Sequence, residues 1–168
     1  MSSEEEEDEE FVSRLISNWK RTRRLTYDLA KSVPVSILNK KVGRPIYDTI
    51  GKQIYEMALM QRDYTNALEG EEPDFSLALP RNFSVGSRAE LSNALNDADA
   101  HFYEVINGIG DWYEEKYDIL GNAFSAYNIV NMMIEHETYH QGQFAALGYM
   151  LNIKFPASWT REWSLHLG

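Results

Sequence analysis

The chain has 168 residues, no cysteine and a formal net charge of −10. This length favours one domain, and the lack of cysteine excludes disulfides, cysteine nucleophiles and thiolate metal sites. No apolar run approaches the ~20 residues of a membrane span, and the acidic N-terminus is unlike a signal peptide. We therefore expect a soluble, cytoplasmic protein.

The negative charge is concentrated at the N-terminus. Residues 4–10 hold seven of the 26 acidic residues, so the remaining 19 acids against 16 bases give the rest of the chain a charge of −3. We expect a disordered acidic arm over residues 1–10, followed by a single domain over residues 11–168. This charge argues against nucleic-acid binding. The basic cluster Lys20, Arg21, Arg23 and Arg24 is interpreted as a solvated helix face, with phosphate binding or pairing with the arm as alternatives.

Apolar residues at helical spacing predict four long helices, separated by the prolines. The first helix covers residues 9–32, and the second runs from Pro45 to Leu68. A long connection over residues 69–86 precedes the third helix, which begins with the capping box from Ser87 to Glu90 and ends at Gly108. The fourth covers residues 122–151.

The remaining segments carry weaker patterns. Residues 111–120 are aromatic and acidic and receive no assignment, and no strand of useful length is predicted. The last dozen residues contain Trp159, Trp163 and Leu165, which is too apolar for a free tail, so we expect them to fold back. The predicted fold is all-α: a four-helix bundle with a long crossover between its second and third helices.

Two histidines in the fourth helix carry the clearest chemical signal. His136 and His140 are spaced i and i+4, which places them on one helix face where they can share a metal ion. Gln143, three residues later, lies on the same face and is a candidate for orienting a ligand. The alternative is a pair of hydrogen-bonded histidines in a partly buried groove. His101 is interpreted as a surface or capping histidine.

The same segment spells H-E-x-x-H, the zinc-protease pattern, with Glu137 as general base. A third zinc ligand would have to be Glu162 or His166, and no strand is available to present a substrate. Glu137 lies about 100° around the helix from His136, so it faces solvent or a neighbouring helix in the alternative interpretation. The protease hypothesis is therefore the weaker one.

The segment from His136 to Gln143, followed by Gly148, Asn152-Ile153 and Pro156-x-x-Trp159, resembles the closing helix of the DinB/YfiT-like superfamily. Val33-Pro34 and Thr49-Ile50-Gly51 support the resemblance, which covers residues 11–160. It implies a four-helix bundle, a homodimer and a divalent metal ion held by three histidines. Gln141 stands where an arginine is common in the family.

Two of the three implied ligands fall on His136 and His140. The third falls on Glu56, where the family has histidine. Glutamate is a competent ligand for zinc, nickel, manganese or iron, so Glu56, His136 and His140 form the expected metal set. The alternative is a degenerate site in which Glu56 only pairs with a base. Gln53, one turn earlier, is expected beside the ligands.

The resemblance implies a metal-dependent enzyme acting on a small molecule. Its two candidate chemistries are hydrolysis and transfer or isomerisation with a low-molecular-weight thiol, with Glu137 as the candidate catalytic base. The competing hypothesis is a non-catalytic binding or stress-response module that keeps the fold with a degenerate metal site. Fold analogy alone does not decide between them.

Overall fold

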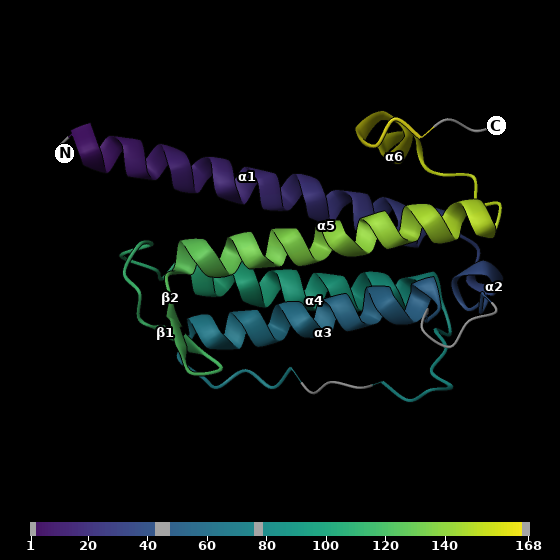
Figure 1. The fold of residues 1–168 in the computed structure, drawn as a ribbon, viewed down its shortest axis with the longest axis horizontal. Helices are drawn as coiled ribbons and strands as arrows, with labels where there is room; N and C mark the ends of the chain where they lie inside the picture. Colours follow the sequence, from purple (N-terminus) through teal and green to yellow (C-terminus); the bar gives the residue numbers. More distant parts are fainter. Residues whose placement is uncertain (1–2, 43–47, 76–78, 166–168) are drawn as a thin grey trace.

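The four predicted helices are present, joined by shorter elements (Figure 1). The computed structural model describes residues 3–42, 48–75 and 79–165. The long helices are α1 (Ser3–Ser32), α3 (Ile50–Leu68), α4 (Arg88–Ile106) and α5 (Ala126–Met150), and the short elements are α2 (Val35–Leu38), β1 (Tyr117–Ile119), β2 (Asn122–Phe124) and α6 (Ala157–Glu162). The all-α four-helix bundle is therefore confirmed.

The long helices pack as two pairs, α1 against α5 and α3 against α4, and the pairs meet along α3–α5 and α1–α4. α3 and α4 run in the same direction, opposite to α1 and α5 (Figure 1). Two parallel neighbours cannot be joined by a tight turn, so the chain between them returns along the whole bundle. This is the crossover predicted over residues 69–86.

The acidic run is part of the first turns of α1. α1 begins at Ser3, and Glu7 to Glu10 are exposed on its first turns. Carboxylates near a helix N-terminus interact favourably with the unpaired amides and the helix dipole. The disordered arm over residues 1–10 stays a prediction.

Capping residues fix where α3 and α4 begin. The predicted start of α3 at Pro45 falls outside the described residues; in the structure Thr49 caps α3 and accepts from the Lys52 amide at 3.2 Å. Ser87 caps α4, as predicted, and accepts from the Glu90 amide at 3.1 Å. In a capping box the Glu90 carboxylate would accept from the amide of Ser87. Here it accepts from the amide of Gly86, one residue earlier, at 2.7 Å.

A β-hairpin precedes α5, and the sequence did not predict it. β1 and β2 pair antiparallel through Leu120 and Gly121, whose positive φ angles of 53° and 79° match the tight turn that favours a hairpin. The predicted helix start at residue 122 is therefore wrong, and α5 begins after Ser125. Ser125 and Asn128 form the capping box of this helix.

The C-terminal segment folds back over α1, as predicted. α5 ends in a Schellman motif in which Asn152 has a φ of 53° and the Ile153 amide donates to the Gly148 carbonyl at 2.8 Å. Trp159 on α6 is buried, and its indole N–H donates to the Leu25 carbonyl at 2.6 Å. Trp163 remains partly exposed.

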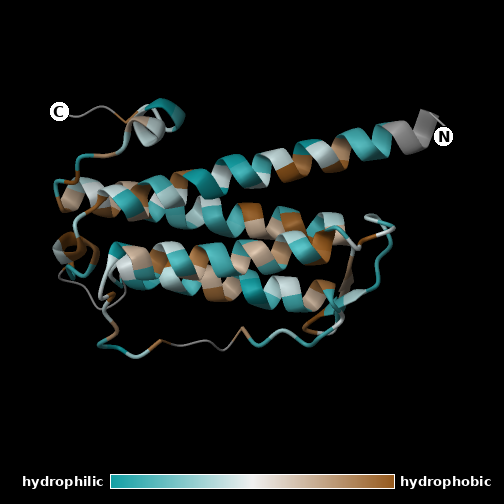
Figure 2. Cartoon of the chain, turned by 180° about the vertical axis from the view of Figure 1, so that it is seen from behind, coloured by the Kyte–Doolittle hydropathy of each residue, from teal (hydrophilic) through white to brown (hydrophobic). Residues whose placement is uncertain are grey.

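The hydrophobic core is divided into two clusters. One lies at the end with α2 and α6 and includes Leu29, Ile54 and Leu95, and the other lies at the hairpin end and includes Trp19 and Phe102. Hydrophobic and hydrophilic residues are mixed along every long helix (Figure 2). No helix in the described ranges is long and apolar enough to cross a membrane. Between the two clusters lies a polar layer, which contains the candidate site.

Candidate metal centre

His136 and His140 converge on one point beside α3. Their Nε2 atoms are 3.2 Å apart, and their rings lie nearly perpendicular with centroids 4.6 Å apart. Two imidazole ligands of one metal ion, each bonded at about 2.0–2.1 Å, place their nitrogens about 2.9–3.4 Å apart for angles between about 90° and tetrahedral. The observed separation falls within this range, so the pair fits two ligands of one metal ion, and it equally fits the alternative of a hydrogen bond between the two rings.

Gln53 fixes the orientation of His140. Its side-chain amide donates to the Asp48 carbonyl at 2.9 Å, which leaves its Oε1 atom to accept from His140 Nδ1 at 3.1 Å. With the proton on Nδ1, Nε2 carries the free lone pair that a metal requires. Outer partners of this kind orient ligating histidines in metal sites.

Burial keeps both imidazoles neutral. It lowers the pKa of His136 to about 4, and the nearby His140 and Arg23 add to the shift. The pKa of His140 is also lowered by burial, an effect that the side chain of Gln143 opposes. Neutral imidazole is the ligating form, so both residues are ready to bind a cation at neutral pH.

Glu56 is paired with Lys52 on its own helix, α3. α3 and α5 run antiparallel, so Glu56, one turn beyond Gln53, is level with His136. Its carboxylate pairs with Lys52 Nζ at 3.6 Å, and burial raises its pKa. Within the described ranges no three His, Cys, Asp or Glu side chains are arranged to hold a metal ion. Glu56 as third ligand therefore stays a prediction.

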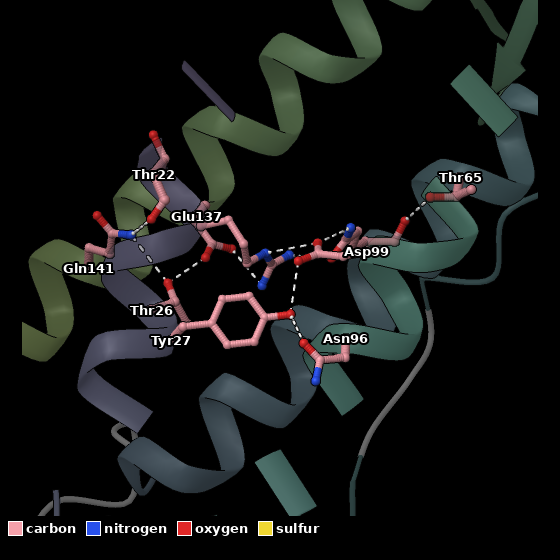
Figure 3. A network of polar contacts seen from close by, with 10 residues as sticks. Thr22, Thr26, Tyr27, Thr65, Asn96, Asp99, Glu137 and Gln141 are labelled. Carbon is pink, nitrogen blue, oxygen red and sulfur yellow. Dashed lines mark hydrogen bonds and ion pairs between the residues drawn. The ribbon is translucent and has the colours of Figure 1, made fainter. Parts of the chain in front are cut away.

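Glu137 points into the bundle, toward α1 (Figure 3). It is buried, accepts from the Thr26 hydroxyl, and faces Arg23 Nη1 at 3.3 Å. Burial raises its pKa, while Arg23 and Thr26 oppose the rise. Of the two orientations left open by the sequence, Glu137 faces the neighbouring helix α1, and these contacts do not favour its predicted role as catalytic base.

Glu137 belongs to a buried polar network that joins all four long helices (Figure 3). At its centre, the nearly buried guanidinium of Arg23 also bonds Gln61 on α3 and faces Asp99 on α4 at 3.4 Å. Gln61 in turn donates to Asp99 at 2.9 Å. Sequence reasoning missed this network because Arg23 stands within a run of bases that looked solvent-exposed.

Gln141 completes the contact between α5 and α1. Its side-chain nitrogen donates to the Thr22 carbonyl at 2.8 Å and to the Thr26 hydroxyl at 3.2 Å. The signal in the sequence was positional: Thr22 and Thr26 continue the apolar stripe of Leu15 and Trp19, so polar residues stand where core residues are expected.

A groove of about 730 Å³ follows the outer side of α5. Its lining includes Tyr139, Gly142, Gln143 and Met150, and is mostly apolar. Neither of the two histidines lines it, and two of its lining residues, Tyr139 and Gln143, contact His140. Gln143 is thus placed between a surface groove and the histidine pair.

The other candidate ligands lie elsewhere. Glu162 on α6 pairs with Arg21 on α1, which leaves it engaged away from α5. His166 is outside the described residues. His101 pairs with Glu69 at 2.8 Å on the surface of α4, in keeping with its interpretation as a surface residue. Glu162 therefore gives the protease hypothesis no third ligand.

Comparison with known proteins now identifies the family. The DinB family model matches residues 1–148. The chain belongs to the DinB family. Its structure is also similar to the crystal structure of a DinB-like protein from Bacillus cereus ATCC 10987, with a TM-score of 0.69 and 14% sequence identity over 85% of this chain and 94% of that one. No curated protein matches the chain.

Family membership confirms the resemblance and the DinB-like fold. At 14% identity the structural likeness supports the fold alone. What the histidine pair binds must therefore be argued from this chain's own residues.

Proposed function

We propose that this DinB-family protein is a metal-dependent enzyme in which His136 and His140 bind one divalent ion. The observation that carries the proposal is the 3.2 Å separation of their two Nε2 atoms. The bond from His140 Nδ1 to Gln53 supports it, because it leaves the lone pair of His140 Nε2 facing His136. The depressed pKa of His136 also supports it, because neutral imidazole is the ligating form.

Glu56 is the proposed third ligand. It stands one turn beyond Gln53 on α3, and to bind a metal its carboxylate would have to leave Lys52. Lys52 would keep its closer partner, Asp48, at 2.6 Å. Two histidines and one carboxylate leave coordination positions open for a substrate, and suit zinc, nickel, iron or manganese.

A divalent ion at this place supplies Lewis-acid chemistry to a small-molecule substrate. The two candidate reactions are hydrolysis and transfer or isomerisation with a low-molecular-weight thiol. In either reaction Gln53 and Gln143 orient His140. Glu137 acts as a positioning residue, because its carboxylate is committed to Arg23 and Thr26 in holding α5 against α1.

The test measures turnover before and after removal of the metal by a chelator. Ester and amide substrates test for hydrolysis, and electrophiles supplied together with small thiols test for thiol transfer. Activity should disappear with the metal, return on reloading, and be absent in His140→Ala. The matched control is His101→Ala, which removes a surface histidine and should retain activity. Turnover unchanged after complete chelation would contradict the proposal.

The competing function is a non-catalytic binding module with a degenerate metal site. The observation favouring it is the Glu56–Lys52 pair, which leaves two histidines without a third ligand in the described structure. Thermal melting separates the alternatives, because an ion at 100 times its dissociation constant adds ~2.7 kcal/mol to stability. A melting temperature that stays unchanged when zinc, nickel, manganese or iron is added would favour the non-catalytic module.

A further inference from the structure

A polar groove lies on the opposite edge of the bundle from the histidine pair. It runs between α1 and α4 and has a volume of about 420 Å³. The histidines lie where α5 meets α3, so the two sites lie between different pairs of helices. A volume of this size suits a small molecule.

Basic residues from one stripe of α1 line this groove. Lys20, Arg24 and Lys31 are spaced by four and seven residues, so they follow one face over about 16 Å of helix. Arg24 has no hydrogen-bond or ion-pair partner among the described residues. Its planar, five-donor guanidinium is suited to two-point contact with an oxyanion.

Two tyrosines hold the lysines in place. Lys20 Nζ lies 5.3 Å from the centroid of the Tyr103 ring, and Lys31 Nζ lies 5.2 Å from that of Tyr27. Burial raises the pKa of Tyr103 to about 12, so its hydroxyl stays protonated and neutral at physiological pH. These cation–π contacts favour side-chain conformations in which both ammonium groups lie beside the groove.

The acids in the lining do not cancel this positive charge. Four bases and two acids line the groove, which leaves a formal charge of +2 in a chain whose total is −10. Asp99 already accepts from Tyr27 at 2.9 Å and from Gln61, and faces Arg23 at 3.4 Å. Asp28 is the other acid.

We propose that this α1–α4 groove binds a small molecule bearing a phosphate group, with Arg24 as its principal contact and Lys20 and Lys31 on either side. Phosphate carries up to two charges and three strong acceptor oxygens, which matches three cations better than a single carboxylate does. Exposed Asp97 and Glu104 on α4 disfavour a long polyanion that would extend beyond the groove.

Calorimetric titration of the full chain with pyrophosphate, at constant ionic strength and with EDTA present, tests this proposal. We expect saturable binding that weakens at least about tenfold in Arg24→Gln, because a hydrogen bond to a charged group is lost. Lys20→Gln/Lys31→Gln should weaken it similarly. The matched control is Arg62→Gln, which removes an exposed arginine of α3 and should bind as the wild type does.

The outcomes separate this site from the histidine pair. His136→Ala/His140→Ala should retain pyrophosphate binding, since the groove does not depend on a metal. Absence of saturable binding by the wild type, or equal affinity in Arg24→Gln and Arg62→Gln, would overturn the proposal. So would binding to phosphatidylglycerol vesicles without binding to pyrophosphate, because that result would assign the basic stripe to a membrane surface.

Discussion

Gln53 decides the chemical state of His140. Its amide is fixed by the Asp48 carbonyl, so its oxygen faces the imidazole and accepts the Nδ1 proton. The result is a histidine pair whose Nε2 atoms face each other at 3.2 Å. The sequence predicted the pair from i, i+4 spacing, but not the direction of the Glu56 carboxylate, which depends on competition between Lys52 and a metal ion.

Replacing Glu56 by histidine tests that competition. The change removes the ion pair with Lys52 and places an imidazole level with His136, which restores the family's three-histidine pattern. Zinc and nickel should bind more tightly than in the wild type, measured by calorimetric titration of chelator-treated protein. Unchanged affinity for every metal would show that Glu56 is not a ligand.

Acid should destabilise the metal-free protein through His136. Its pKa is lowered from 6.5 to about 4, so between these values the unfolded chain binds a proton that the folded protein excludes. The contribution of neutral His136 to the free energy of unfolding is therefore fully present above pH 6.5. It falls by up to about 3 kcal/mol as the pH drops to about 4. Urea unfolding of His136→Gln should show a correspondingly shallower pH dependence. A slope equal to that of the wild type would contradict the assignment.

At the scale of elements, α5 illustrates what sequence patterns resolve. Its existence and its C-terminal end followed from periodicity and from Asn152. The start of α5 could not be predicted in this way, because the three-residue strands of the hairpin are too short to produce an alternating hydrophobic pattern. The acidic arm over residues 1–10 stays a prediction, because charge density and the stabilisation that a helix N-terminus gives to carboxylates act in opposite directions there.

Two glycines of α5 offer a matched pair of substitutions. A Cβ atom on Gly148 would lie 2.1 Å from Phe155 Cζ, whereas one on Gly142 would meet nothing within 4 Å. Gly148→Ala should cost about 1–3 kcal/mol, because Phe155 must leave its place against Trp159. Gly142→Ala should gain about 0.5–1 kcal/mol from helix propensity. Chemical denaturation measures both, and equal effects would contradict the packing described here.

At the scale of the whole molecule, the polar layer divides the core. Residues from all four long helices meet around Arg23, with one hydrophobic cluster on each side. The histidines stand at the α3–α5 edge of this layer and the basic groove at its α1–α4 edge. The fold was predictable because apolar stripes dominate each helix. The layer was not, because it depends on four separate helices placing polar side chains at the same level.

Arg23→Met should destabilise the protein by about 3–5 kcal/mol. The substitution leaves the buried carboxylates of Glu137 and Asp99 without their shared cation, and an uncompensated buried charge is costly. Arg21→Met, two residues away, removes an exposed arginine paired with Glu162 and should cost less than about 1 kcal/mol. Urea denaturation of both variants is the measurement. Similar costs would show that the layer contributes little to stability.

The metal content of the purified protein tests the central claim most directly. Elemental analysis should find one divalent metal ion per chain in the wild type and in His101→Ala, and none in His140→Ala. A wild-type chain that contains no metal and takes none up from zinc, nickel, manganese or iron would contradict the claim. So would full metal content in His140→Ala, because the ion would then be bound elsewhere.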